Sequence, residues 1–137
     1  MNRVVITGMG AITPLGNTVT EFWDGIKNGK NGIAAITNFD ASETGISVAG
    51  EVKDFDATKY MDRKEYKRMD LFSQYAVAAS AQAVEQSGID MEKIDADRFG
   101  VTIGSGVGGF ITMESGIIKM HEKGPKRVPP MFVPMAI

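Results

Sequence analysis

Residues 99–109 have the sequence FGVTIGSGVGG, in which an apolar, β-branched run passes directly into a glycine-rich turn. Such a run predicts a buried β-strand over residues 99–103. A helix is predicted after the turn, ending at Gly124-Pro125. Its apolar residues recur at helical spacing: Phe110, Met113, Ile117 and Met120. The order strand, glycine turn, helix is typical of an α/β fold.

Two further strands and one helix are predicted from the same kinds of pattern. Residues 4–7 form a β-branched run that Gly8 ends, and a weaker run spans residues 46–52. Thr18 and Glu21 have the spacing of a capping box, and Asn28-Gly29 ends the helix that this box begins. Trp23 is expected in the core on that helix. Strands that alternate with helices predict a largely parallel sheet.

The middle of the chain predicts two more helices. Asp62 and Glu65 begin a short basic helical turn. Asp70 is predicted to cap a long helix that runs through Ser87 and ends at Gly88. This helix is rich in alanine, so another backbone can approach it closely.

The composition excludes several classes of protein. The chain has 137 residues, 43% of them apolar, and its 15 basic and 17 acidic residues give a net charge of −2. It therefore fits one domain without a separate second domain, and it is neither disordered nor broadly basic like a nucleic-acid-binding protein. It has no cysteine, which excludes disulfides and thiol nucleophiles within it. Its 16 glycines exceed the usual ~7% and indicate tight turns.

The chain contains no targeting segment and no apolar run near the ~20 residues of a membrane helix. A cytoplasmic location is therefore expected.

The turn at residues 104–109 has two interpretations. It matches G-x-G-x-x-G between a strand and a helix, as in a dinucleotide-binding turn. That turn also requires a second strand with an acidic residue about 20 residues further on, where this chain has Lys-Gly-Pro-Lys-Arg from residue 123. We favour a tight turn packed against a neighbouring segment or an apolar ligand, and dinucleotide binding is the weaker hypothesis.

Basic residues gather in two windows of this net-acidic chain. Lys64, Lys67 and Arg68 have the spacing of one helical face. The second window contains Lys119, Lys123, Lys126 and Arg127. Each window alone fits a solvated face. For the two windows together, a solvated face and a docking surface for an acidic partner are equally favoured. Nucleic acid is disfavoured, because no aromatic residues interleave with the basic ones.

The sequence contains no catalytic constellation and no metal site. His121, the only histidine, lies at a predicted helix end, and its neighbour Glu122 does not share its face. We expect a structural or solvent-facing role for it. Asp54 and Asp56 lack the glycine and closing glutamate of a calcium loop.

Four stretches, in the same order, resemble elongating β-ketoacyl-acyl-carrier-protein synthases. They are VVITGMGAITPLGN at residues 4–17, RKEYKRMD at 63–70, GSGVGG at 104–109 and PPMFVP at 129–134. The resemblance covers essentially the whole chain. It is greatest to β-ketoacyl-acyl-carrier-protein synthase II, the type II synthase of bacterial fatty-acid synthesis.

This resemblance implies an α/β fold of the thiolase-like kind, with two similar halves in layers αβαβα, and a protein that works as a homodimer. Residues 1–137 correspond to part of the first half of that fold. Members of the family transfer an acyl group from acyl carrier protein to a cysteine. They then condense it with decarboxylated malonyl-carrier protein, without a cofactor. The family's cysteine, two histidines and lysine follow the PPMFVP stretch, so this segment is expected to be inactive alone. Its apolar last residues indicate a chain cut inside a buried region.

The resemblance also assigns site residues by position. The family's basic patch for acyl carrier protein corresponds to Lys64, Lys67, Arg68, Lys126 and Arg127. The acyl-chain pocket corresponds to Gly106, Val107 and Phe132, and the Phe132 segment also lies near the family's dimer interface. The alternatives are a non-catalytic module that docks carrier protein, and a ketosynthase domain of a polyketide pathway.

Overall fold

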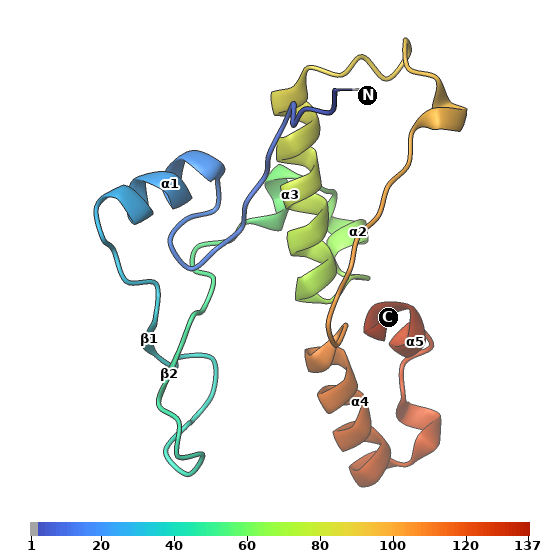
Figure 1. Ribbon diagram of the computed structural model, residues 1–137. Coiled ribbons are helices and arrows are strands. Elements are labelled where there is room, and N and C mark those ends of the chain that lie inside the picture. The colour runs from blue at the N-terminus through green and yellow to red at the C-terminus, as the bar shows by residue number, and fades with distance from the viewer. Residues whose placement is uncertain (1–2) are drawn as a thin grey trace. The chain divides into compact units, whose positions relative to one another are not determined.

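The computed structural model describes residues 3–137, which form two compact units (Figure 1). The first contains residues 3–56 and Ala79–Gly88, and the second contains Ala57–Ala78 and Ile89–Ile137. The long helix α3, Leu71–Ser87, therefore contributes to both. We describe each unit by itself.

The first unit begins its regular structure with α1, Val19–Lys27. The Thr18 hydroxyl accepts a hydrogen bond from the Glu21 amide at 3.2 Å, which confirms the predicted start of this helix. The Glu21 carboxylate in turn accepts from the Asn17 amide at 2.7 Å. Gly29, with φ +64°, follows the helix end at the predicted stop. Trp23 is 56% exposed, so the prediction that it lies in the core is wrong: more than half of its surface is accessible to solvent in this unit.

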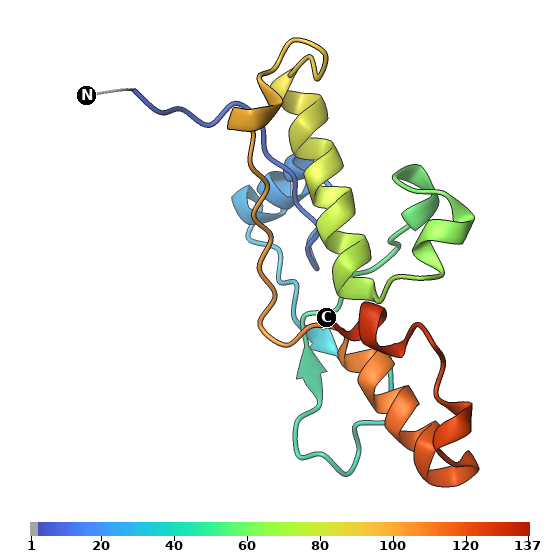
Figure 2. The same cartoon turned by 90° about the vertical axis from the view of Figure 1, so that its right-hand side faces the viewer.

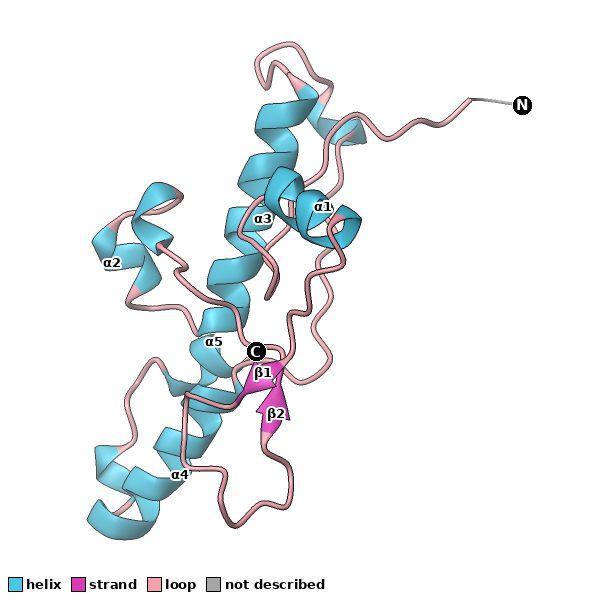
Figure 3. Ribbon diagram, turned by 90° about the vertical axis from the view of Figure 1, so that its left-hand side faces the viewer, coloured by secondary structure: helices cyan, strands magenta, loops and turns pink. Residues whose placement is uncertain are grey.

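The described residues contain one sheet, a pair of two-residue strands (Figure 3). Strands β1, Ala34–Ala35, and β2, Val48–Ala49, are antiparallel, with Ala34 opposite Ala49. The Glu51 carboxylate fixes the chain that leaves β1 by accepting three hydrogen bonds. They come from the Thr37 hydroxyl at 2.6 Å and from the Thr37 and Asn38 amides, each at 3.0 Å. The Thr37 hydrogen bonds, from hydroxyl and amide, lower the pKa of Glu51 below its ordinary value.

The N-terminal segment of the first unit packs against the backbone of α3. A Cβ atom on Gly8 would overlap the carbonyl oxygen of Ala83, and one on Gly10 would overlap that of Ala79. Glycine on one side and alanine on the other therefore permit this contact. It confirms the prediction that the alanine-rich helix accepts a close neighbour.

Two glutamines of α3 also hold this segment. Gln86 accepts from the Met9 amide at 2.6 Å. Gln82 accepts from the Ala11 amide at 3.2 Å and donates to the Asn17 carbonyl at 2.7 Å. Side-chain amides thus satisfy backbone groups that a neighbouring strand would otherwise satisfy.

The second unit is helical. Its shorter helices are η1 (Ala57–Lys59), α2 (Arg63–Tyr66), η2 (Ala96–Arg98), η3 (Pro125–Arg127) and α5 (Phe132–Ala136). Its longest complete helix is α4, Phe110–Lys123, and η3 and α5 fold back along it (Figure 2). Asp62 and Glu65 form a capping box at the start of α2, as their spacing predicts. The unit's buried apolar side chains among the described residues are Ala57, Met61 and Ala78.

The strand predictions for residues 4–7 and 99–103 are wrong for this structure, and no parallel sheet is present among residues 3–137. The prediction for residues 46–52 is correct only at Val48–Ala49. A β-branched run favours an extended backbone, but a strand also needs a neighbouring backbone for its ladder. Neither wrongly predicted segment has one, and Val4 and Ile6 are 91% and 83% exposed.

Candidate functional site

The second unit contains an apolar pocket of about 750 Å³ beside the glycine turn. Its wall is formed by the start of α3, the glycine turn with Ile103 before it, Met113 of α4, and the end of α5. Its lining residues include Phe72, Ser73, Ala76 and Val77 of α3, Gly106 and Val107 of the turn, and Ala136 and Ile137. Because the walls are mostly aliphatic, the pocket suits an apolar ligand.

The glycine turn is held by protein acceptors at its amide groups. The Gly108 amide donates to the Ser105 hydroxyl at 3.0 Å, and the Gly109 amide donates to the Ala136 carbonyl at 2.9 Å. A Cβ atom on Gly109 would overlap the carbonyl oxygen of Met135, so this position needs glycine. The structure therefore supports a tight turn packed against a neighbouring segment.

Asp70 occupies the N-terminal end of α4. Asp70 is 6% exposed, and its carboxylate accepts a hydrogen bond from the Thr112 amide at 2.8 Å. Gly109, the N-cap residue of α4, has no side chain to make such a bond. Asp70 thus caps α4 from 42 residues away in the chain.

The position of Asp70 corrects one prediction and weakens another. The prediction that Asp70 caps α3 is half right, because its carbonyl accepts from the Gln74 amide at 3.2 Å while its carboxylate caps α4. A dinucleotide turn places a phosphate at the N-terminus of the following helix. A buried carboxylate already lies there, and its charge would repel a phosphate.

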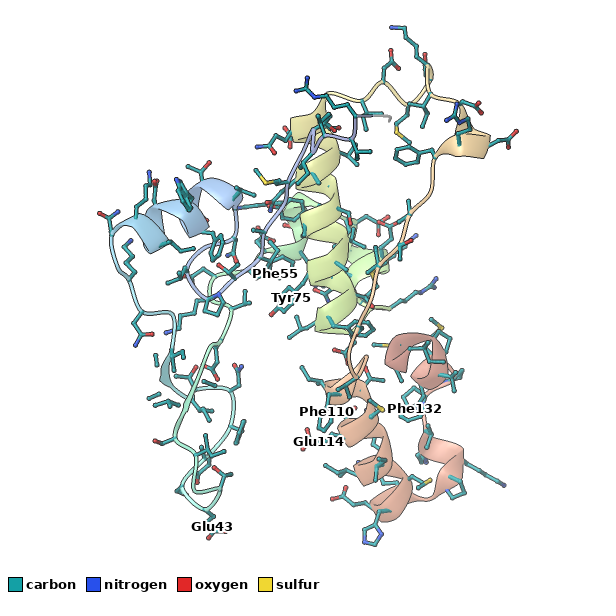
Figure 4. The ribbon with its side chains drawn as sticks, viewed as in Figure 1. Glu43, Phe55, Tyr75, Phe110, Glu114 and Phe132 are labelled. Atoms are coloured by element: carbon teal, nitrogen blue, oxygen red, sulfur yellow. The ribbon has the colours of Figure 1, made fainter. Side chains whose placement is uncertain are left out.

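The structure brings together two of the three predicted pocket residues. Gly106 and Val107 line the pocket, and Val107 is 64% exposed. Phe132 is not among the lining residues: it lies between α5 and α4, with its ring against Gly116 (Figure 4). The end of α5 lines the pocket instead. The lining face of α3 was missed, although its residues at 72, 73, 76 and 77 have the spacing of one helical face.

The predicted basic residues lie exposed on two elements of the second unit. Lys64 is in α2, and Lys67 and Arg68 are in the turn that follows it, so α2 itself is shorter than the predicted helical face. Lys126 and Arg127 are in η3. Arg127 shares a surface pocket of about 590 Å³ with Lys119 and Lys123.

His121 is exposed in the last turn of α4, as predicted. Among residues 3–137, no three His, Asp or Glu side chains gather as metal ligands do. No helix in that range is both long enough and apolar enough to span a membrane.

Comparison with known proteins identifies a family and its relatives. The family model of the beta-ketoacyl synthase N-terminal domain matches residues 1–137. The chain is 50% identical over 135 residues to 3-oxoacyl-[acyl-carrier-protein] synthase 2 of Synechocystis sp. and 48% identical to that of Vibrio harveyi. Each match covers 98% of this chain and 32% of the relative, so the chain spans about a third of the length of these curated relatives.

The structure of this chain matches a part of several solved ketosynthases. The ishigamide ketosynthase/chain length factor matches 97% of the chain with a TM-score of 0.86 and 28% identity. A type II polyketide acyl carrier protein in complex with its ketosynthase matches 100% of it with a TM-score of 0.80 and 28% identity. A beta-ketoacyl synthase from Burkholderia phymatum matches 96% with a TM-score of 0.76 and 31% identity. Each match covers about a third of the solved chain.

Proposed function

This chain belongs to the family of beta-ketoacyl synthase N-terminal domains, and we propose that it is the amino-terminal part of a 3-oxoacyl-[acyl-carrier-protein] synthase of fatty-acid biosynthesis. The observation that carries this proposal is the 50% identity to such a synthase across 98% of the chain. The solved ketosynthases support the same thiolase-like α/β class.

In the proposed reaction, a cysteine thiolate of the full-length protein holds the growing acyl chain as a thioester. Loss of CO2 from malonyl-carrier protein leaves a carbanion that attacks the thioester carbonyl. A carbon–carbon bond forms, the carbon–sulfur bond breaks, and the cysteine leaves as a thiolate. Residues 1–137 contain no cysteine, so the nucleophile comes from outside them.

In this reaction, residues 1–137 would bind the acyl chain and the carrier protein. The apolar pocket beside Gly106 and Val107 would take the acyl chain. Phe132 packs on Gly116 of α4, so it would hold α5 in place and thereby position the end of α5 that lines the pocket. The exposed basic residues would bind an acidic carrier protein, and a ketosynthase among the structural neighbours is solved in complex with its acyl carrier protein. Homodimer formation, a cytoplasmic location and inactivity of the segment alone remain predictions.

The condensation itself is the direct test. The full-length protein, acylated from acyl-carrier protein and mixed with malonyl-carrier protein, should release CO2 and form a 3-oxoacyl-carrier protein two carbons longer. Mass spectrometry of the carrier detects that product. Carrier binding without condensation would favour the non-catalytic docking module and contradict the proposal.

The basic residues should contribute most of the electrostatic attraction to the carrier. Lys64→Glu and Arg68→Glu are each expected to weaken carrier binding about tenfold, which is about 1.4 kcal/mol, because each replaces attraction by repulsion. Titration calorimetry at two salt concentrations measures the effect, which should shrink at high salt. Lys93→Glu is the matched control, because Lys93 is exposed and paired with Asp90 at 2.7 Å on another loop. An equal loss in this control would contradict a specific docking surface.

The side chain of Val107 should limit the length of acyl chain that the pocket accepts. In Val107→Phe the larger ring would occupy part of the pocket, so condensation of the longest accepted acyl chains should fall about tenfold while the shortest are unaffected. Rates measured over a series of acyl-carrier proteins test this. Val107→Ala should leave the long chains accepted. A uniform loss for all chain lengths in Val107→Phe would show that the pocket does not hold the acyl chain.

A further inference from the structure

Three cations line the surface pocket at the C-terminal end of α4. Lys119 and Lys123 are one helical turn apart, and Arg127 lies in η3, which folds back along α4 (Figure 2). These three side chains are the whole lining of this pocket of about 590 Å³, and all three are exposed. The pocket therefore has three positive charges and no carboxylate.

None of these three cations forms an ion pair within the described chain. The ion pairs among residues 3–137 are Asp24–Lys27 and Asp90–Lys93, which lie on other elements. Glu122 has the spacing to pair with Lys119 but forms no ion pair with it and does not line the pocket.

The dipole of α4 explains only part of this cluster. Lysine in the last turn of a helix is stabilised by the partial negative charge at that end, which accounts for Lys123. Arg127 lies beyond the helix, and the chain returns it to the same pocket. The turn that returns it is ordered by hydrogen bonds from the Gly124 amide to the Met120 carbonyl at 3.0 Å and from the Arg127 amide to the Gly124 carbonyl at 3.1 Å.

We infer that this pocket binds a phosphate group, either the free ion or a small phosphate monoester. A guanidinium presents paired donors to phosphate oxygens, and two ammonium groups supply further charge-assisted hydrogen bonds. A phosphate dianion would relieve the mutual repulsion of the three cations. The pocket shares Arg127 with the residues assigned to carrier binding, whereas Lys119 and Lys123 lie outside that set. Phosphate binding is measured without carrier protein, so this inference and the proposed function can fail separately.

The test is a titration of the full-length protein with inorganic phosphate and, separately, with glycerol 3-phosphate, followed by ³¹P NMR at constant ionic strength. We expect saturable binding in the millimolar range, weakened at least tenfold in the double variant Lys119→Gln, Lys123→Gln. Lys126→Gln is the matched control, because Lys126 lies in η3 but does not line the pocket, and it should change binding less than twofold. Thermal melting of each variant establishes that it is folded.

The relative affinities of the two probes identify the ligand. Tighter binding of glycerol 3-phosphate indicates an organic phosphate, and tighter binding of inorganic phosphate indicates the free ion. Absence of saturable binding by both probes, or binding that the double variant retains, would overturn the inference. A surface that recognises only the carboxylates of a partner protein would give that negative result.

Discussion

Replacing Gly10 by alanine should lower the free energy of unfolding of the full-length protein by about 3 kcal/mol, because the new methyl group would overlap the carbonyl oxygen of Ala79. Helical backbone cannot move aside as a flexible side chain can, so the N-terminal segment must separate from α3. Denaturant unfolding followed by circular dichroism measures the change.

A second glycine provides the control for this prediction. At Gly100 a Cβ atom would meet no other atom within 4 Å, and its backbone does not need glycine. Gly100→Ala should therefore change stability by less than about 0.5 kcal/mol. Equal effects of the two substitutions would show that the contact between Gly10 and α3 does not determine stability.

Removing the carboxylate of Asp70 should have the next largest effect. In Asp70→Ala the Thr112 amide loses its acceptor and α4 loses its cap, so a loss of about 2 kcal/mol is expected. Asp70→Asn keeps an acceptor oxygen and should recover about half of that loss. Denaturant unfolding measures both variants.

Hydrogen exchange separates this capping role from a general loss of stability. The Thr112 amide should exchange much faster in Asp70→Ala, because its hydrogen bond is gone. Asp62→Ala is the matched control: Asp62 caps the exposed helix α2, so its loss should leave exchange at Thr112 unchanged. Normal protection of Thr112 in Asp70→Ala would contradict the assignment.

Helix ends could be predicted from the sequence because their signals are local. Thr18 lies next to the amides that it caps, and Gly88, with φ +63°, adopts a backbone conformation that other residues rarely do. Strands could not be predicted in the same way. The run at residues 4–7 favours an extended backbone, but its ladder depends on a distant segment that a local pattern does not contain.

The candidate site shows the same division between local and distant information. The family resemblance of the glycine turn assigns Val107 to an acyl pocket, and Val107 lines an apolar pocket in this structure. Asp70 could be identified as a capping residue, but not as the cap of α4, because 42 residues separate it from Thr112. The packing of Phe132 on Gly116 is likewise a tertiary contact, and no spacing in the sequence indicates it.

The two glutamines of α3 that hold the N-terminal segment have a consequence for how that segment is aligned. Gln82 and Gln86 are separated by about 6 Å along the helix, and their partners, the amides of Ala11 and Met9, by about 6.6 Å along an extended backbone. The spacing of one helical turn therefore matches the spacing of two residues in the extended segment. Inserting one residue between Met9 and Ala11 would break the hydrogen bond of at least one glutamine. Helix α3 therefore sets the alignment of this segment, which has no neighbouring strand among the described residues.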